Sequence, residues 1–215
     1  KPDLTILSAI GCIFSNFLAL LDAGERDALT SLYNRRMFDT RLSSLVRSTV
    51  NEAHIEGERR ARQPEPTNFL GIIDIDFFKR VNDDFGHLFG DEVLLWMARH
   101  MRQCFRNADS LFRYGGEEFA VLLTGLTQKQ AQETFERFRT TIATNDFPQI
   151  GQITVSIGYS HIDRQANPTL VFGDADKALY YAKEHGRNRV FCYQQLLADN
   201  LLEADIQENV DIEIF

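Results

Sequence analysis

The chain has 215 residues, of which 44% are apolar, and a formal net charge of −8. This length allows one domain of ordinary size with extensions, and the apolar content is that of a globular protein. The acidic balance argues against a nucleic-acid polymer or an anionic membrane surface as the partner, although it is compatible with a local nucleotide site. Cys12, Cys104 and Cys192 lack metal-ligand spacing and indicate free thiols in a reducing compartment.

The first part of the chain predicts a helix over residues 4–23. Its apolar residues recur at steps of three and four, which is the pattern of a coiled-coil seam. The residues in this pattern are Leu7, Ile10, Phe14, Phe17 and Leu21. The run is short, so it fits either a dimerising stalk that carries a signal or a helix that packs on its own domain.

We divide the chain into an N-terminal helix at 1–24, a main domain at 25–194 and an acidic tail at 195–215. No secretion signal is recognisable, and we expect the main domain to be cytoplasmic. The sequence lacks an initiating methionine, so we expect it to be a fragment of a longer protein. We expect a sensory domain upstream, and its attachment to a membrane is left open.

The remaining elements alternate around one hairpin. Helices are predicted over residues 27–58, 90–105, 127–143 and 172–184. Strands are predicted over residues 69–75, 111–114, 119–123, 153–159 and 189–192. A polar segment at 56–66 with two prolines reads as a solvated insertion without chemistry. This order predicts an α+β, ferredoxin-like fold, with a central, mainly antiparallel sheet covered by helices on one face.

Gly115 and Gly116 separate the two strands of the hairpin, and we predict a two-residue loop because glycine adopts a positive φ at little cost. Glu117 and Glu118 follow this turn directly. Adjacent residues of a strand face opposite sides of a sheet. We therefore do not expect the two carboxylates to be one redundant pair.

A second acidic cluster closes the apolar run 69–73, where Asp74 and Asp76 flank Ile75. Acids that end one strand and acids that flank a hairpin turn can meet across one edge of a sheet. Hard oxygen ligands in that arrangement suit Mg²⁺ that is bound together with substrate phosphates.

Four segments in one order resemble the GGDEF family, the diguanylate cyclases, with the signature spelled GGEEF at residues 115–119. Residues 27–36 match D-x-L-T-x-L-x-N-R-R, and residues 74–83 match D-I-D-x-F-K-x-x-N-D. Gly86-His87 and Gly90-Asp91 continue that second segment. Residues 175–188 match the closing A-D-x-A-L-Y-x-A-K-x-x-G-R-N. One such motif can arise by chance, whereas four in the right order and spacing are specific.

The resemblance implies a fold akin to the nucleotidyl cyclase and polymerase palm. It implies a reaction that condenses two GTP molecules into cyclic di-GMP and releases two pyrophosphates. Each bond forms when a ribose 3′-hydroxyl attacks an α-phosphate in line, which needs alignment and charge neutralisation. It also implies two Mg²⁺ ions per active site, with Mn²⁺ as an alternative, and a homodimer in which each domain contributes one GTP.

The resemblance carries metal ligation to Asp74 and Glu117, with the Ile75 carbonyl as a backbone ligand. It makes Glu117 the acceptor of the 3′-hydroxyl proton. Glu118 belongs to the same catalytic signature, either as a second metal contact or as a supporting part. Asp76 is expected to be structural or to support the ligands.

The substrate-binding positions that the resemblance implies are Phe77, Phe78, Lys79, Asn82, His87, Asp91, Lys183 and Arg187. The amides that open the helix after Phe77 can hold phosphate oxygens, while the Phe77 and Phe78 rings are expected in the core. Asn82 and Asp91 are expected to read the guanine edge, because together they offer a donor and acceptors. His87 is expected to shape the same loop.

Arg106 and Asp109 stand in an R-x-x-D string five residues before Gly115. This placement resembles the family's inhibitory site, where the product binds away from the catalytic centre. Arg137 is a weaker candidate for the same site. An R-x-x-D string is frequent by chance, and an ordinary surface ion pair is the alternative, but the placement favours the inhibitory site.

Two alternatives to an active cyclase stay open. The first is a catalytically silent module that binds GTP or cyclic di-GMP and signals by contact. The second is a related cyclase or polymerase that uses another nucleotide. The retained acids favour the enzyme, and Asn82 with Asp91 favours guanine.

Overall fold

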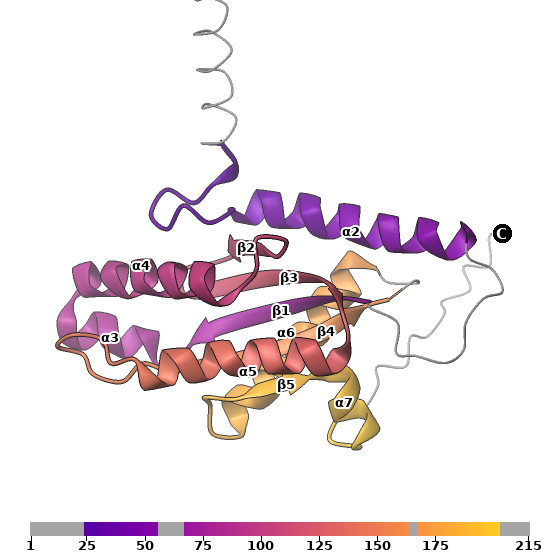
Figure 1. Ribbon diagram of the computed structural model, residues 1–215. Helices are drawn as coiled ribbons and strands as arrows, with labels where there is room; N and C mark the ends of the chain where they lie inside the picture. The colour runs from indigo at the N-terminus through magenta and orange to yellow at the C-terminus, as the bar shows by residue number, and fades with distance from the viewer. Residues whose placement is uncertain (1–23, 56–66, 164–166, 203–215) are drawn as a thin grey trace, which may run out of the picture.

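The computed structural model describes residues 24–55, 67–163 and 167–202 (Figure 1). The predicted N-terminal helix at 4–23, the insertion at 56–66 and the tail beyond residue 202 lie outside these ranges. The division of the chain into three parts therefore stays a prediction. No helix in the described ranges is both long enough and apolar enough to cross a bilayer.

A five-stranded sheet with the order β2-β3-β1-β4-β5 forms the centre of the domain. Its strands are β1 Thr67–Ile75, β2 Ser110–Arg113, β3 Glu118–Leu126, β4 Val155–Ile162 and β5 Val190–Cys192. All neighbours pair antiparallel except β4 and β5, which are parallel. The prediction of an α+β fold with a mainly antiparallel sheet is confirmed.

Helices cover both faces of this sheet, so the prediction that they cover one face is wrong. The helices are α2 Arg35–Ile55, α3 Phe78–Phe85, α4 His87–Cys104, α5 Gln128–Thr144, α6 Pro168–Glu184 and α7 Tyr193–Ala198. In Figure 1, α4 and α5 lie in front of the sheet and α6 lies behind it.

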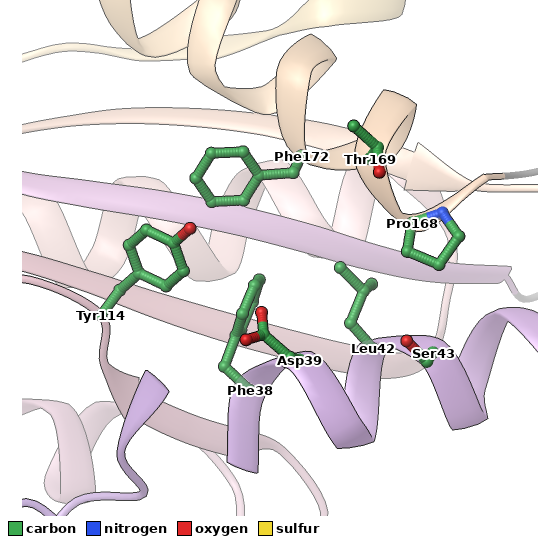
Figure 2. Close-up of a pocket in the computed structure, with 8 residues that line it drawn as sticks. All are labelled: Phe38, Asp39, Leu42, Ser43, Tyr114, Pro168, Thr169 and Phe172. Carbon is green, nitrogen blue, oxygen red and sulfur yellow. The ribbon is translucent and has the colours of Figure 1, made fainter. Parts of the chain in front are cut away.

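Strand β1 supplies both cores, because its side chains alternate between the two faces. Phe69 and Ile73 belong to the core under α3, α4 and α5. Leu70 and Ile72 belong to the core shared with α2 and α6. On this second face, Phe38 of α2 lies near α6 and Tyr114 (Figure 2).

Several helices begin at other residues than predicted, because polar side chains cap them. The helix predicted from residue 27 begins at Arg35, where Asn34 Oδ1 accepts from the Met37 amide at 3.1 Å. Asp27 instead closes a separate turn, accepting from the Thr30 amide at 2.8 Å. Helix α6 begins four residues early for the same reason, since Asn167 caps its first turn.

The hairpin loop is longer than the two residues predicted. Strand β2 ends at Arg113 and β3 begins at Glu118. The Tyr114 and Gly115 amides both donate to the Glu118 carbonyl, at 2.9 and 3.1 Å, which widens the turn. Neither glycine of the pair has a positive φ, so the conformational reason given for them does not hold.

Gly158 on β4 sets the distance between the sheet and α6. An added Cβ there would lie 2.0 Å from the Leu179 amide nitrogen and 2.2 Å from the Ala175 carbonyl oxygen. Both are helix backbone atoms, so the helix itself would have to move.

We expect Gly158→Ala to lower the free energy of unfolding by about 3 kcal/mol, because it forces the backbone of α6 away from β4. Gly173→Ala is the matched control, since nothing lies within 4 Å of its added Cβ. That variant should gain about 0.5–1 kcal/mol from helix propensity. Urea unfolding measures both, and equal stability of the two variants would contradict this packing.

Candidate active site

Asp74, Glu117 and Glu118 are grouped near the end of β1. Asp74 lies opposite Glu118 on β3 and opposite Ser156 on β4. The Asp74 residue is only 5% exposed, and Glu117 immediately precedes β3. Because Glu117 lies in the turn rather than in the strand, the alternation rule used to separate it from Glu118 does not apply to it.

Burial raises the pKa of all three acids. The charge of Asp74 then raises the pKa values of Glu117 and Glu118 further. Both glutamates are therefore close enough to interact with the same buried aspartate. Burial and like charge disfavour the ionised form of these acids, and nearby positive charge would stabilise it.

Lys183 and Arg187 supply positive charge to this cluster. Lys183, in the last turn of α6, has its Nζ 2.9 Å from Asp74 Oδ2. The charges of Lys183 and Arg187 oppose the rise in the pKa of Asp74. The Arg187 guanidinium also lies 4.5 Å from the centre of the Phe77 ring. The structure thus brings two of the predicted substrate-binding residues to the acids.

Asp76 fixes the chain immediately after β1. It is 6% exposed, and its carboxylate accepts from Thr154 Oγ1 at 2.7 Å, Ser156 Oγ at 2.7 Å and the Asn188 amide at 2.9 Å. These bonds tie β1 to β4 and to the segment before β5. The three partners of Asp76 were not predicted from the sequence.

The segment after β1 turns sharply into α3. Phe77 has a left-handed φ of 59° and a residue exposure of 62%, so the prediction that its ring is in the core is wrong. Phe78 is buried as expected. Lys79 is exposed in the first turn of α3, where it can reach an anion held by the helix N-terminus.

The predicted guanine readers lie on two packed helices. Asn82 of α3 lies against α4, where an added Cβ on Gly90 would lie 2.0 Å from Asn82 Oδ1. Asp91 follows Gly90 and is exposed, and His87 is the exposed first residue of α4. Gly90 is therefore needed for this approach, a role that the sequence analysis did not identify.

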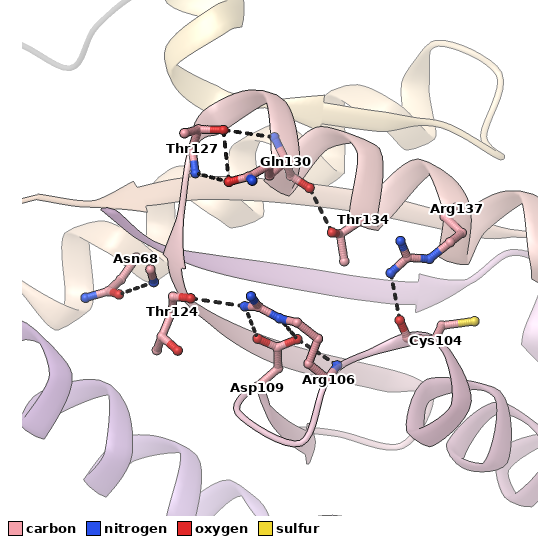
Figure 3. A network of polar contacts seen from close by, with 10 residues as sticks. Asn68, Cys104, Arg106, Asp109, Thr124, Thr127, Gln130, Thr134 and Arg137 are labelled. Carbon is pink, nitrogen blue, oxygen red and sulfur yellow. Dashed lines mark hydrogen bonds and ion pairs between the residues drawn. The ribbon is translucent and has the colours of Figure 1, made fainter. Parts of the chain in front are cut away.

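Arg106 and Asp109 bind each other at the turn between α4 and β2 (Figure 3). Arg106 Nη2 lies 2.8 Å from Asp109 Oδ1 and also donates to the Thr124 carbonyl at 3.0 Å. The Asp109 side chain is 0% exposed, whereas that of Arg106 is 48% exposed. Arg137 donates to the Cys104 carbonyl at 2.8 Å, next to this turn. Arg106 is thus accessible and Asp109 is not.

Residues 25–189 match the family model described as "Diguanylate cyclase, GGDEF domain". The chain belongs to the GGDEF family. It is 37% identical to Diguanylate cyclase A of Treponema denticola, over 88% of this chain and 50% of that protein. It is 40% identical to the diguanylate cyclase DgcP of Pseudomonas aeruginosa, over 76% of this chain and 23% of that protein. The chain therefore spans half or less of the length of these relatives.

The fold is also that of solved GGDEF structures. The coiled coil and GGDEF domain of DgcB from Caulobacter crescentus, in complex with c-di-GMP, superimposes with a TM-score of 0.76. The two chains are 26% identical, and the match covers 87% of this chain and 95% of that one. The predicted palm-like architecture is confirmed.

Contacts that were not predicted from the sequence hold the signature turn, residues 114–117 between β2 and β3. Arg113 Nη1 pairs with Asp27 Oδ1 at 3.1 Å, and its Nη2 donates to the Gly116 carbonyl at 2.9 Å. An added Cβ on Gly115 would lie 2.6 Å from Glu118 Oε2. Gly115 therefore makes room for a carboxylate. The opposite charges of Arg113 and Asp27, which lie in two different motif segments, could have indicated their contact from the sequence.

The acids of this GGDEF domain fit a divalent cation that is shared with a substrate. Within the described ranges, no three His, Cys, Asp or Glu side chains converge closely enough to hold a metal ion by themselves. Asp74 and Glu117 supply hard oxygen atoms in a cluster that attracts positive charge. Mg²⁺ commonly takes one or two carboxylates and completes its shell with phosphate oxygens and water.

We expect Glu118→Gln to stabilise the domain near pH 8, because the raised pKa of Glu118 means that its ionised form opposes folding. The gain should shrink as pH falls through the raised pKa of native Glu118, and it should vanish once pH is below the ordinary glutamate range, where the unfolded chain is protonated as well. Urea unfolding across this range measures the difference. Glu133→Gln, on the exposed side of α5, is the control. A gain that does not depend on pH would contradict the electrostatic explanation.

Proposed function

We propose that this domain is a diguanylate cyclase that condenses two GTP molecules into cyclic di-GMP and two pyrophosphates. The observation that supports this most is the grouping of Asp74, Glu117 and Glu118 beside Lys183. The curated relatives named above are diguanylate cyclases, and they share the family of this chain. The retained acids favour the enzyme over a silent nucleotide-binding module.

In this proposal, Asn82 and Asp91 bind the guanine edge. The Asp91 carboxylate accepts from N1–H and the exocyclic amine, and the Asn82 amide adds a donor and an acceptor. Adenine would leave these groups unpaired. His87 lies at the start of α4 beside them and shapes the entrance to the base site.

Positive groups on the other side of the site hold the triphosphate. Lys183 and Arg187 approach from the end of α6, and Lys79 approaches from the first turn of α3. The backbone amides of Phe77 and Phe78 bind phosphate oxygens at that helix start. When the substrate binds, Lys183 contacts its phosphates and interacts less strongly with Asp74.

The reaction also needs divalent metal, for which we propose Mg²⁺, with two ions per site and Mn²⁺ as an alternative. Asp74, Glu117 and the Ile75 carbonyl would hold it. When bound, it neutralises triphosphate charge and lowers the pKa of the attacking 3′-hydroxyl. Glu117 accepts the hydroxyl proton, a role that suits a carboxylate whose pKa is raised. Glu118, packed against Gly115, keeps the turn and its acids in place.

Two domains must face each other, because one domain holds one GTP and the product contains two. We propose a homodimer with two-fold symmetry, in which the helix predicted at 4–23 acts as the stalk. An upstream sensory domain would then control how often the two half-sites meet. The main domain is proposed to work in the cytoplasm.

We further propose product inhibition at Arg106, Asp109 and Arg137. Arg106 is half exposed and can offer its guanidinium as a fork to guanine or phosphate. Asp109 would have to leave Arg106 before it accepts from a guanine edge, because its carboxylate is fully covered. A structural relative has been solved in complex with c-di-GMP, which supports binding of this product by the family.

The test of the main proposal is incubation of the chain with GTP and Mg²⁺, followed by mass spectrometry of the product. We expect cyclic di-GMP, formed at a rate per protomer that rises with protein concentration. Glu117→Gln should lower turnover by about a hundredfold to ten-thousandfold, because it removes the proton acceptor and a metal ligand.

Glu133→Gln makes the same chemical change on an exposed face of α5 and should leave turnover unchanged. Circular dichroism should show that both variants are folded. Binding of GTP without any product in the wild-type chain would support the silent module instead. A different cyclic nucleotide would support another substrate.

Arg106→Ala should relieve product inhibition, raising the cyclic di-GMP concentration that halves the rate by about tenfold or more. Progress curves with added product measure this. Since Arg106 also neutralises the covered Asp109, Arg106→Lys is the control that keeps a cation there while losing the fork. Unchanged inhibition in both folded variants would reject this site.

A further inference from the structure

A cavity of about 300 Å³ lies between α2, the signature turn and the start of α6 (Figure 2). Its apolar walls are Phe38 and Leu42 of α2, Tyr114 of the turn, and Pro168 and Phe172 of α6. We call it the aromatic pocket. None of these residues belongs to the guanine, phosphate or product sites proposed above.

Three aromatic rings of the pocket lie close to one another. The ring centres are 4.9 Å apart for Tyr114 and Phe172, 5.1 Å for Phe38 and Tyr114, and 6.0 Å for Phe38 and Phe172. Rings at these separations pack directly on one another and form one aromatic wall of the pocket. A cation over the face of such a ring is attracted by its quadrupole.

The wall of the pocket carries one negative charge, that of Asp39. Asp39 is exposed and has no hydrogen-bond or ion-pair partner within the described ranges. Burial raises the pKa of the Tyr114 hydroxyl, Asp39 and Glu118 raise it further, and Arg35 opposes the rise. Ser43 and Thr169 add hydroxyl groups at the wall.

Tyr114 already accepts a cation from within the chain. The Arg35 guanidinium lies 4.6 Å from the centre of its ring. Arg35 thus occupies a face of Tyr114, and a cationic guest would use Asp39 and the other rings of the pocket. Pockets of this size, mostly apolar with a few polar groups, are typical of small-molecule sites.

We propose that the aromatic pocket binds a small organic ammonium compound, with its apolar body against the wall formed by Phe38, Leu42 and Phe172 and its charge at Asp39. The pocket is also connected to Glu118 and Asp74 through the backbone of Tyr114. The Tyr114 amide donates to the Glu118 carbonyl, and Glu118 lies opposite Asp74. A guest that displaces the Tyr114 ring therefore moves the signature turn and lowers turnover, an effect that rests on the proposed cyclase function.

The binding test uses the 215-residue chain without GTP and 2-phenylethylammonium as the probe, measured by calorimetry or ligand-observed NMR. We expect saturable binding, about tenfold tighter than that of 2-phenylethanol, which has the same shape without the charge. Asp39→Asn should remove most of this preference. Asp146→Asn, on an exposed residue elsewhere, should preserve it.

Leu42→Trp should fill the pocket and abolish binding. Because Leu42 is buried and this variant can fail to fold, Thr169→Trp at the exposed wall is the second blocking variant. Equal affinity for the alcohol and the ammonium compound would overturn the proposal. Binding that survives both Asp39→Asn and a folded blocking variant would overturn it as well.

The coupling is tested by the rate of cyclic di-GMP formation with saturating probe. We expect the rate to fall in the wild-type chain and to stay constant in the blocked variant. Turnover without probe binding would reject the pocket while the cyclase function stands. Probe binding without turnover under any condition would reject the cyclase function while the pocket stands. Binding with an unchanged rate would reject the coupling.

Discussion

The antiparallel pairing of β1 with both β3 and β4 is the constraint on which the site depends. This register places Asp74 opposite Glu118 on one side and Ser156 on the other. Because strand side chains alternate, Asp74 shares a face with Leu70 and Ile72 and points towards α6, where Lys183 meets it. A slip of one residue would turn the carboxylate into the opposite apolar core and would separate it from Lys183.

The site is also where the fold departs from local preference. Burial and mutual repulsion oppose ionisation of the three acids. Phe77 and Arg187 both adopt a left-handed φ of 59°, and their side chains stack on each other at 4.5 Å. Non-glycine residues in this region carry backbone strain, and such strain gathers where function needs a fixed geometry. The covered hydrogen bonds of Asp76 hold these segments in place.

Local sequence patterns predicted most of this fold and did less well on its boundaries and long-range contacts. The apolar run 69–73 identified β1, and its unbroken character also indicated burial on both faces, which was not used. The hairpin loop was misjudged because two glycines suggested a tight turn, whereas neither has a positive φ and Gly115 lies beside the Glu118 carboxylate. The family motifs grouped Asp74, Glu117 and Lys183 as site residues, but no local rule pairs Arg113 with Asp27.

Two separate parts of the chain contact the signature turn, and through it they can affect the positions of Glu117 and Glu118. On one side, Asn34 binds the Gly24 carbonyl, and Asp27 in the same segment pairs with Arg113, which in turn holds Gly116. On the other side, Tyr114 packs among the rings of α2 and α6. The segment that follows the predicted stalk and the aromatic pocket thus contact the same short loop. Since Glu117 lies in that loop and Glu118 closes it, a shift of either support moves the carboxylates before it disturbs the sheet.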